Sequence, residues 1–119
     1  MNVSQREVYM LPFPLKEGGQ DHPFIVLSCN ESNNLENTFI AVMITSSSYT
    51  DDYSFDLRDE MFERPLAKQG CHVRMHLITL VEVADIKNRI VNKMKPIYFK
   101  NLMAVIGELI FDYEFTPNS

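Results

Sequence analysis

Four side chains that could act on a phosphodiester stand at the ends of strand-like segments or within them. His22 precedes one apolar segment, Thr45 directly follows a second, and Arg74 and His76 alternate within a third. A histidine can give or take a proton near neutral pH, and an arginine carries a permanent charge that suits phosphate. Together with a hydroxyl, such groups could activate an RNA 2′-hydroxyl and stabilise the charge that develops on the phosphate.

Each of these residue types also has an ordinary structural explanation. Serine and threonine side chains commonly bond to nearby backbone and cap turns, which would account for the polar run at 45–48. An isolated strand histidine is more often a packing or surface residue, and an isolated arginine is more often solvated or ion-paired. Lys16 and Gln20 flank a glycine pair, but no GK[ST] follows it, so this loop is not a phosphate loop.

The elements that must position these side chains are short strands. Apolar residues run unbroken from Phe39 to Ile44 before the chain turns polar, which predicts a strand buried on both faces. Period-two spacing in the segment 71–81 predicts a long strand with two distinct faces. One face would carry Val73, Met75 and Leu77, and the other would carry His72, Arg74 and His76. Further strands are predicted at 7–13, 23–29, 53–57 and 89–94, with a polar turn at 30–36.

The last predicted element is a helix that begins at Pro96, because proline is well tolerated at a first helical position. Its apolar residues follow helical spacing and predict a stripe that packs on the sheet. The stripe consists of Leu102, Val105, Ile106, Leu109, Ile110 and Tyr113. Several short strands and one closing helix indicate a small, partly open β-barrel with a packed C-terminal helix. We expect one domain over 1–119, with its core at about 6–113 and a flexible tail at 114–119.

Composition narrows the function classes. The net charge of -5 argues against a simple electrostatic nucleic-acid binder. Its distribution is uneven, since residues 51–63 are acidic and residues 64–100 hold eight basic against two acidic side chains. A basic face could therefore still meet phosphates, although scattered and solvated charges are an equal alternative. No apolar run is long enough to span a membrane and no signal pattern opens the chain, so we expect a cytoplasmic protein. Cys29 and Cys71 fit reduced thiols, and no metal-binding or cofactor-binding pattern occurs.

The order of motifs resembles the MazF/PemK toxin family over about residues 6–112. The opening strand with Phe13-Pro14, the glycine loop, and His22-Pro23 before a valine-leucine strand look like the opening of that family. The run 44–46 looks like its Ile-Thr-Ser element, and 71–79 resembles its Ser-x-Val-Arg-x-Asp segment with the following threonine. The closing helix is also in the expected place.

This resemblance implies an SH3-like toxin barrel that forms a homodimer. It implies a metal-independent endoribonuclease that cuts single-stranded RNA at short sequences and is neutralised by an antitoxin with a flexible acidic tail. Thr45, with Ser46, would hold the scissile phosphate, and Arg74 would stabilise the transition state or transfer a proton. Lys16, Gln20 and Ser47 would contribute to substrate binding. The 2′-hydroxyl would be the nucleophile, leaving a cyclic phosphate and a 5′-hydroxyl.

Two positions depart from the family pattern. His22 stands where an arginine is expected, and His76 stands where an aspartate is common. Our hypothesis is that the two histidines form a general acid/base pair. Two alternatives stay open. One is a MazF-like barrel without catalysis that binds RNA or a protein, or poisons gyrase, and the other is an unrelated β-barrel interaction module. Tyr49, Tyr53 and Phe55 are candidate base-stacking groups, although each is more often ordinary packing.

Overall fold

A computed structural model describes residues 2–15 and 17–114. Lys16 and the predicted tail beyond Glu114 lie outside the described residues. The strands are β1 (Glu7–Pro12), β2 (Asp21–Val26), β3 (Thr38–Thr45), β4 (Ser54–Asp56), β5 (His72–Glu82) and β6 (Asn92–Lys93). The helices are α1 (Asn30–Asn33) and α2 (Pro96–Leu109), with 3-10 turns at Asp59–Met61 and Val83–Asp85. The turn predicted at 30–36 thus contains a short helix.

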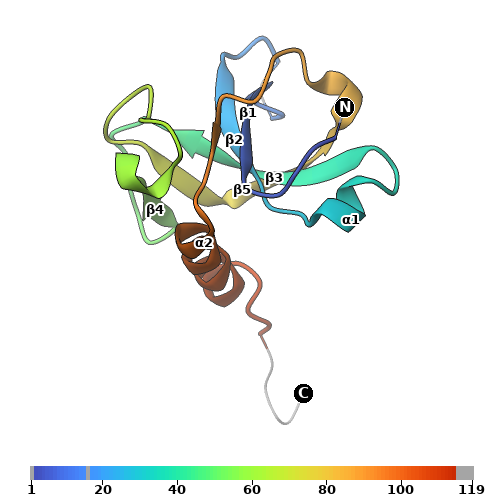
Figure 1. Ribbon diagram of the computed structural model, residues 1–119. Helices are drawn as coiled ribbons and strands as arrows, with labels where there is room; N and C mark the ends of the chain where they lie inside the picture. The colour runs from blue at the N-terminus through green and yellow to red at the C-terminus, as the bar shows by residue number, and fades with distance from the viewer. Residues whose placement is uncertain (1, 16, 115–119) are drawn as a thin grey trace.

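The six strands form one antiparallel sheet in the order β4-β5-β3-β2-β1-β6. Figure 1 shows this sheet curled into an open half-barrel, with α2 beside β4 and β5 and directed away from the sheet. The predicted fold class, a small open barrel with a C-terminal helix, is therefore confirmed. In the described part of the chain, no helix has the length and apolar character needed to cross a membrane.

β3 is the central strand, and its burial on both faces is confirmed from Ala41 to Ile44. The predicted burial of the whole run from Phe39 was wrong at Ile40, which is 41% exposed. Val42 and Ile44 belong to a helix-side core that also holds Phe99, Leu102 and Ile106 of α2. Ala41 and Met43 belong to the opposite core, which includes Val3, Tyr9, Leu11, Phe24, Val26 and Phe39. Since successive strand residues point to opposite faces, an unbroken apolar run supplies both cores at once.

β5 departs from the regular alternation that its sequence predicts. Val42 pairs with Ile78, but Ile44 pairs with Val73, so two steps along β3 correspond to five along β5. The odd number of extra residues reverses which face the following side chains take. Leu77 accordingly packs on the opposite core, whereas Val73 and Met75 lie in the helix-side core. The prediction that these three residues share one face was wrong for Leu77.

His72 was predicted on the exposed face of β5, and that prediction was wrong. His72 is only 1% exposed to solvent. Within the described residues, neither ring nitrogen has a hydrogen-bond partner. A buried polar group without a partner lowers stability, because it has lost its bonds to water. We therefore expect the buried imidazole of His72 to lower the free energy of unfolding.

α2 begins at Pro96 as predicted. Leu102 and Ile106 are buried, and Tyr98, Val105 and Ile110 pack against the helix-side core. The predicted stripe extends too far, because the helix ends at Leu109. Leu109 and Tyr113 are 44% and 79% exposed.

We expect Leu102→Ala to lower the free energy of unfolding by about 2–5 kcal/mol, since it leaves a cavity under α2. Leu109→Ala removes the same atoms from an exposed position of the same helix and should change it by less than about 0.5 kcal/mol. Urea unfolding of both variants measures the difference. Equal effects would contradict the docking of α2 described above.

We expect His72→Leu to raise the free energy of unfolding by about 1 kcal/mol at neutral pH, because it removes two unpaired buried nitrogens. His72→Gln keeps polar atoms in the same place and should not exceed the wild type. Chemical denaturation of the three proteins checks this ranking. A His72→Leu protein less stable than the wild type would show that the imidazole makes a bond that matters.

Candidate functional site

A cleft of about 360 Å³ opens at the edge of the sheet where β2 begins, β3 ends and β5 begins. One wall comes from β1 and β2, and the other comes from the segment 62–68. Four of the predicted site residues lie in its lining: Gln20, His22, Thr45 and Ser46. The remaining lining residues are Val8, Met10, Asp21, Pro23, Ile44, Phe62, Pro65, Leu66, Ala67, Lys68, Cys71, Val91 and Asn92.

The sheet register brings His22 and Thr45 together. Phe24 pairs with Met43 in the β2–β3 ladder, so extending this register by two residues places His22 opposite Thr45. Both residues are half-buried, and the His22 ring meets the Phe13 ring edge-on at 6.2 Å between centroids. A proton-transfer group and a hydroxyl thus share one end of the sheet, although 23 positions separate them in the sequence. Such closeness is one condition that a phosphate site sets for these groups.

The cleft also contains polar residues that sequence reasoning missed. Lys68 supplies the one fixed positive charge among the lining residues that the structure describes, and Asp21 supplies a carboxylate. Both lie in exposed positions next to turns, where nothing in the sequence distinguishes them from solvated charges. Burial raises the pKa of the Cys71 thiol, and nearby Lys68 offsets this only in part. The thiol therefore stays protonated at neutral pH and is a poor nucleophile.

The wall at 62–68 is fastened to the neighbouring strand β6. The Asn92 side chain accepts a hydrogen bond from the Arg64 backbone N–H at 3.1 Å and donates one to the Arg64 carbonyl at 3.0 Å. Phe62 forms a bridge with Met94, and the Glu63 N–H donates to the Lys93 carbonyl at 3.0 Å. Together these side-chain and backbone contacts hold residues 62–64 of the wall beside β6.

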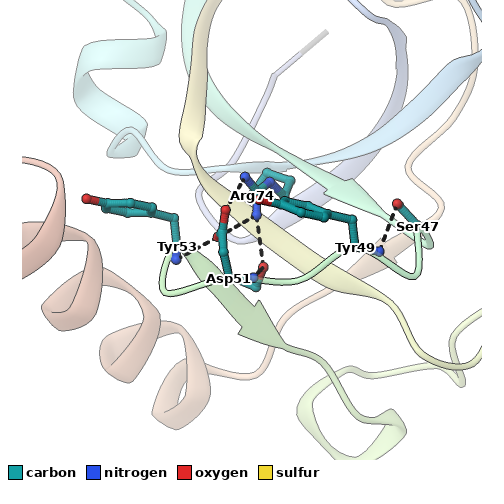
Figure 2. A network of polar contacts seen from close by, with 6 residues as sticks. Ser47, Tyr49, Asp51, Tyr53 and Arg74 are labelled. Atoms are coloured by element: carbon teal, nitrogen blue, oxygen red, sulfur yellow. Dashed lines mark hydrogen bonds and ion pairs between the residues drawn. The ribbon is translucent and has the colours of Figure 1, made fainter.

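Arg74 and His76 do not line this cleft. Figure 2 shows Arg74 beside the loop that joins β3 to β4, where Asp51 accepts two of its hydrogen bonds. The exposed His76 ring meets the Tyr53 ring edge-on at 6.0 Å between centroids. Of the predicted acid/base pair, His22 therefore lines the cleft, whereas His76 lies outside it beside Tyr53. Ser47 also lies outside the lining, and its hydroxyl accepts the Tyr49 N–H.

Thr45 also has the turn-capping role that is common for its type. Its hydroxyl oxygen accepts the Ser47 N–H at 3.2 Å. This bond uses one lone pair, so the O–H can still donate to another group. Among residues 2–15 and 17–114, no group of three or more histidine, cysteine or carboxylate side chains could hold a metal ion. His22, Thr45 and Lys68 line the cleft, so an imidazole, a hydroxyl and an ammonium group belong to the residues around it.

Comparison with known proteins identifies related sequences and folds. The sequence profile of the family described as PemK-like, MazF-like toxins of type II toxin–antitoxin systems matches residues 4–110. No curated protein sequence matches the chain. The resemblance drawn from the motifs above is thus confirmed by the family match.

Several solved structures share the fold at low sequence identity. MazF from Deinococcus radiodurans (crystal form I) is 14% identical, with a TM-score of 0.72 over 94% of this chain and 99% of that one. A MazE–MazF structure from the same organism is 15% identical, with a TM-score of 0.73 over 95% and 100%. A mycobacterial endoribonuclease in complex with its cognate antitoxin is 14% identical, with a TM-score of 0.69 over 97% and 100%.

The Asp51–Arg74 pair predicts a pH dependence of stability. The hydrogen bonds from Arg74 and from the Tyr53 N–H hold the pKa of Asp51 below its ordinary value of 3.8. A depressed folded-state pKa adds stability above the unfolded value and loses it as pH falls through the folded value. The melting temperature of the wild type should therefore exceed that of Asp51→Asn most above pH ~4, with the gap closing at lower pH. A gap that is constant from pH 2 to pH 7 would contradict this.

Proposed function

Because this chain belongs to the PemK-like, MazF-like toxins of type II toxin–antitoxin systems, we propose that it cleaves single-stranded RNA in the cleft that His22 and Thr45 line. The family match makes this chain a member of a toxin family. The observation that carries the proposal is that one cleft contains His22, Thr45 and Lys68. These are the groups that can move a proton, bind a phosphate oxygen and balance negative charge.

The proposed reaction uses the RNA 2′-hydroxyl as its nucleophile. The neutral imidazole of His22 takes the proton of the 2′-hydroxyl, and the resulting oxygen attacks the adjacent phosphorus. The Thr45 hydroxyl donates a hydrogen bond to a non-bridging phosphate oxygen, where negative charge develops. The bond from phosphorus to the 5′-oxygen breaks, and that oxygen takes a proton from Lys68 or from water. The products are a 2′,3′-cyclic phosphate and a 5′-hydroxyl end, and this route uses no metal ion.

Lys68 supplies a positive charge to the cleft at which His22 replaces the expected arginine. A histidine at the position of the expected arginine removes a fixed positive charge from the site. Lys68 lies in the same lining and could balance the charge of the phosphate. A lysine is a point charge without the fork of an arginine, so it would hold the phosphate less directionally. In the proposed site, Gln20 and Ser46 contact the flanking nucleotides.

A protein partner is part of the proposal. Structures of relatives are described as MazE–MazF and as an endoribonuclease with its cognate antitoxin. We propose that an antitoxin segment occupies this same cleft, since the apolar lining from Met10, Phe62 and Leu66 could hold apolar side chains while Lys68 meets a carboxylate. The homodimer and the recognition of a short RNA sequence stay predictions from the family.

A binding role without cleavage is the second candidate. The Asp21 carboxylate lies in the cleft lining, and Arg74, the arginine expected in the site, is paired with Asp51 elsewhere. Both features weaken the attraction of the cleft for an RNA phosphate. This candidate predicts salt-dependent binding of RNA, or binding of a protein target such as gyrase, without chain scission.

Purified protein incubated with long single-stranded RNA in EDTA should produce fragments with 5′-hydroxyl and cyclic phosphate ends. His22→Ala should reduce the cleavage rate by about 10²–10⁴-fold, since it removes the general base. Thr45→Val, which replaces the hydroxyl with a methyl group, should reduce it on the order of 10²-fold. End-group analysis and single-turnover rates measure both effects.

Matched controls separate the site from the fold. Thr38 lies at the other end of β3, and Thr38→Val should leave the rate unchanged. His76→Ala should also leave it near the wild-type value, whereas an acid/base pair with His22 would require a large loss. Well-folded wild-type protein that binds several RNAs but cleaves none would overturn the catalytic proposal in favour of the second candidate. Full activity of both His22→Ala and Thr45→Val would show that the chemistry lies elsewhere.

A further inference from the structure

We propose that Arg74 acts as a positioning residue, which holds the 46–53 loop in the conformation that presents Thr45 and Ser46 to the cleft. This inference rests on the proposed function for its effect on catalysis, but the ordering of the loop can be measured without RNA. It replaces the direct role in phosphate chemistry that the resemblance implied for this arginine. The partner that makes Arg74 effective is Asp51.

The Arg74 side chain from β5 gathers residues from the loop and from β4. Its two terminal nitrogens donate to the two carboxylate oxygens of Asp51, at 2.8 Å and 3.1 Å. One of them also donates to the Ser54 hydroxyl at 2.9 Å. The guanidinium carbon lies 5.8 Å from the centre of the Tyr49 ring, within reach of a cation–π contact. We call Tyr49, Asp51, Ser54 and Arg74 the Arg74 cluster, of which Figure 2 labels Tyr49, Asp51 and Arg74.

The loop itself consists of two local turns. In the first half, the Ser47 N–H donates to the Thr45 hydroxyl, and the Tyr49 N–H donates to the Ser47 hydroxyl. In the second half, the Asp51 carboxylate accepts the Tyr53 N–H at 2.9 Å. Side-chain bonds to neighbouring N–H groups are short-range and fix only their own turn.

Arg74 is the contact that joins the two turns. It touches Tyr49 from the first half and Asp51 from the second. The bidentate geometry fixes the direction of the Asp51 carboxylate as well as its distance, because both partners are planar. The Arg74 side chain is only 13% exposed. The Asp51 side chain is 30% exposed, so the pair lies at the surface, and its contribution rests on the bidentate geometry and on the further bond to Ser54.

Burial and pairing argue against direct contact with a substrate phosphate. Arg74 is absent from the cleft lining, and three of its five N–H groups already donate within the cluster. By contrast, Thr45 and Ser46 lie both in the cleft and at the start of the loop. Release of the loop would shift this rim, and a displacement near 1 Å can lower a rate on the order of 10²-fold.

A double-mutant cycle tests the proposal. Arg74→Ala and Asp51→Ala should each lower the kcat of RNA cleavage by about 10- to 100-fold with a smaller change in KM. The double variant should be no slower than either single variant, because both remove the same contact. Arg74→Lys keeps the charge but loses the fork, so it should behave like Arg74→Ala. Arg58→Ala is the matched control, since Arg58 pairs with Glu60 on the exposed surface and should keep the wild-type kcat.

Hydrogen exchange of the Tyr53 amide gives a readout that does not depend on cleavage. Its N–H bonds to Asp51, so exchange should speed up on the order of tenfold in Arg74→Ala and stay unchanged in Arg58→Ala. Unchanged Tyr53 exchange in Arg74→Ala would overturn the proposal, whether or not RNA is cleaved. A large loss of kcat in Arg74→Ala with normal kcat in Asp51→Ala would overturn it too, because Arg74 would then act on the substrate directly. If the wild type cleaves no RNA, the proposed function fails and the exchange result alone decides the role of Arg74.

Discussion

The double burial of β3 is the constraint on which the rest of this structure depends. A strand that is apolar on both faces must be covered on both, so the chain builds two cores and places β3 between them. α2 closes the helix-side core, and the segment 83–90 with the first strand closes the opposite one. The strand must also leave the apolar layers where its sequence becomes polar. That exit point, Thr45, coincides with the cleft because the neighbouring strands β2 and β5 begin or end at the same edge.

Much of this arrangement was predictable because it follows from local patterns. The run from Phe39 to Ile44, the proline that opens α2 and the order of short strands each carry their structural meaning within a few residues. The placement of His22 opposite Thr45 required one further fact, the register between β2 and β3. That register became visible only when the two strands were paired in the structure.

The errors have a common physical origin in long-range pairing. The surplus of residues in β5 relative to β3 becomes visible only when the strands are paired, and it moved Leu77 to the other core. His72 lies before the extra residues of β5 and is buried, and the alternation of its neighbours in the sequence does not predict that burial. Lys68 lines the cleft, and Arg74 pairs with Asp51 outside it, through contacts that join separate parts of the chain. A single sequence contains no signal for such contacts, because any exposed charge could have made them.

The pair of hydrogen bonds between Asn92 and the Arg64 backbone has a consequence for how a ligand enters. A side-chain amide that satisfies both the N–H and the C=O of one residue imitates a neighbouring strand, so residues 62–64 extend the sheet next to β6. These bonds hold one wall of the cleft without help from a ligand. Under the proposed function, the RNA would fit its conformation to this wall, which a flexible single strand does more readily than a stiff duplex.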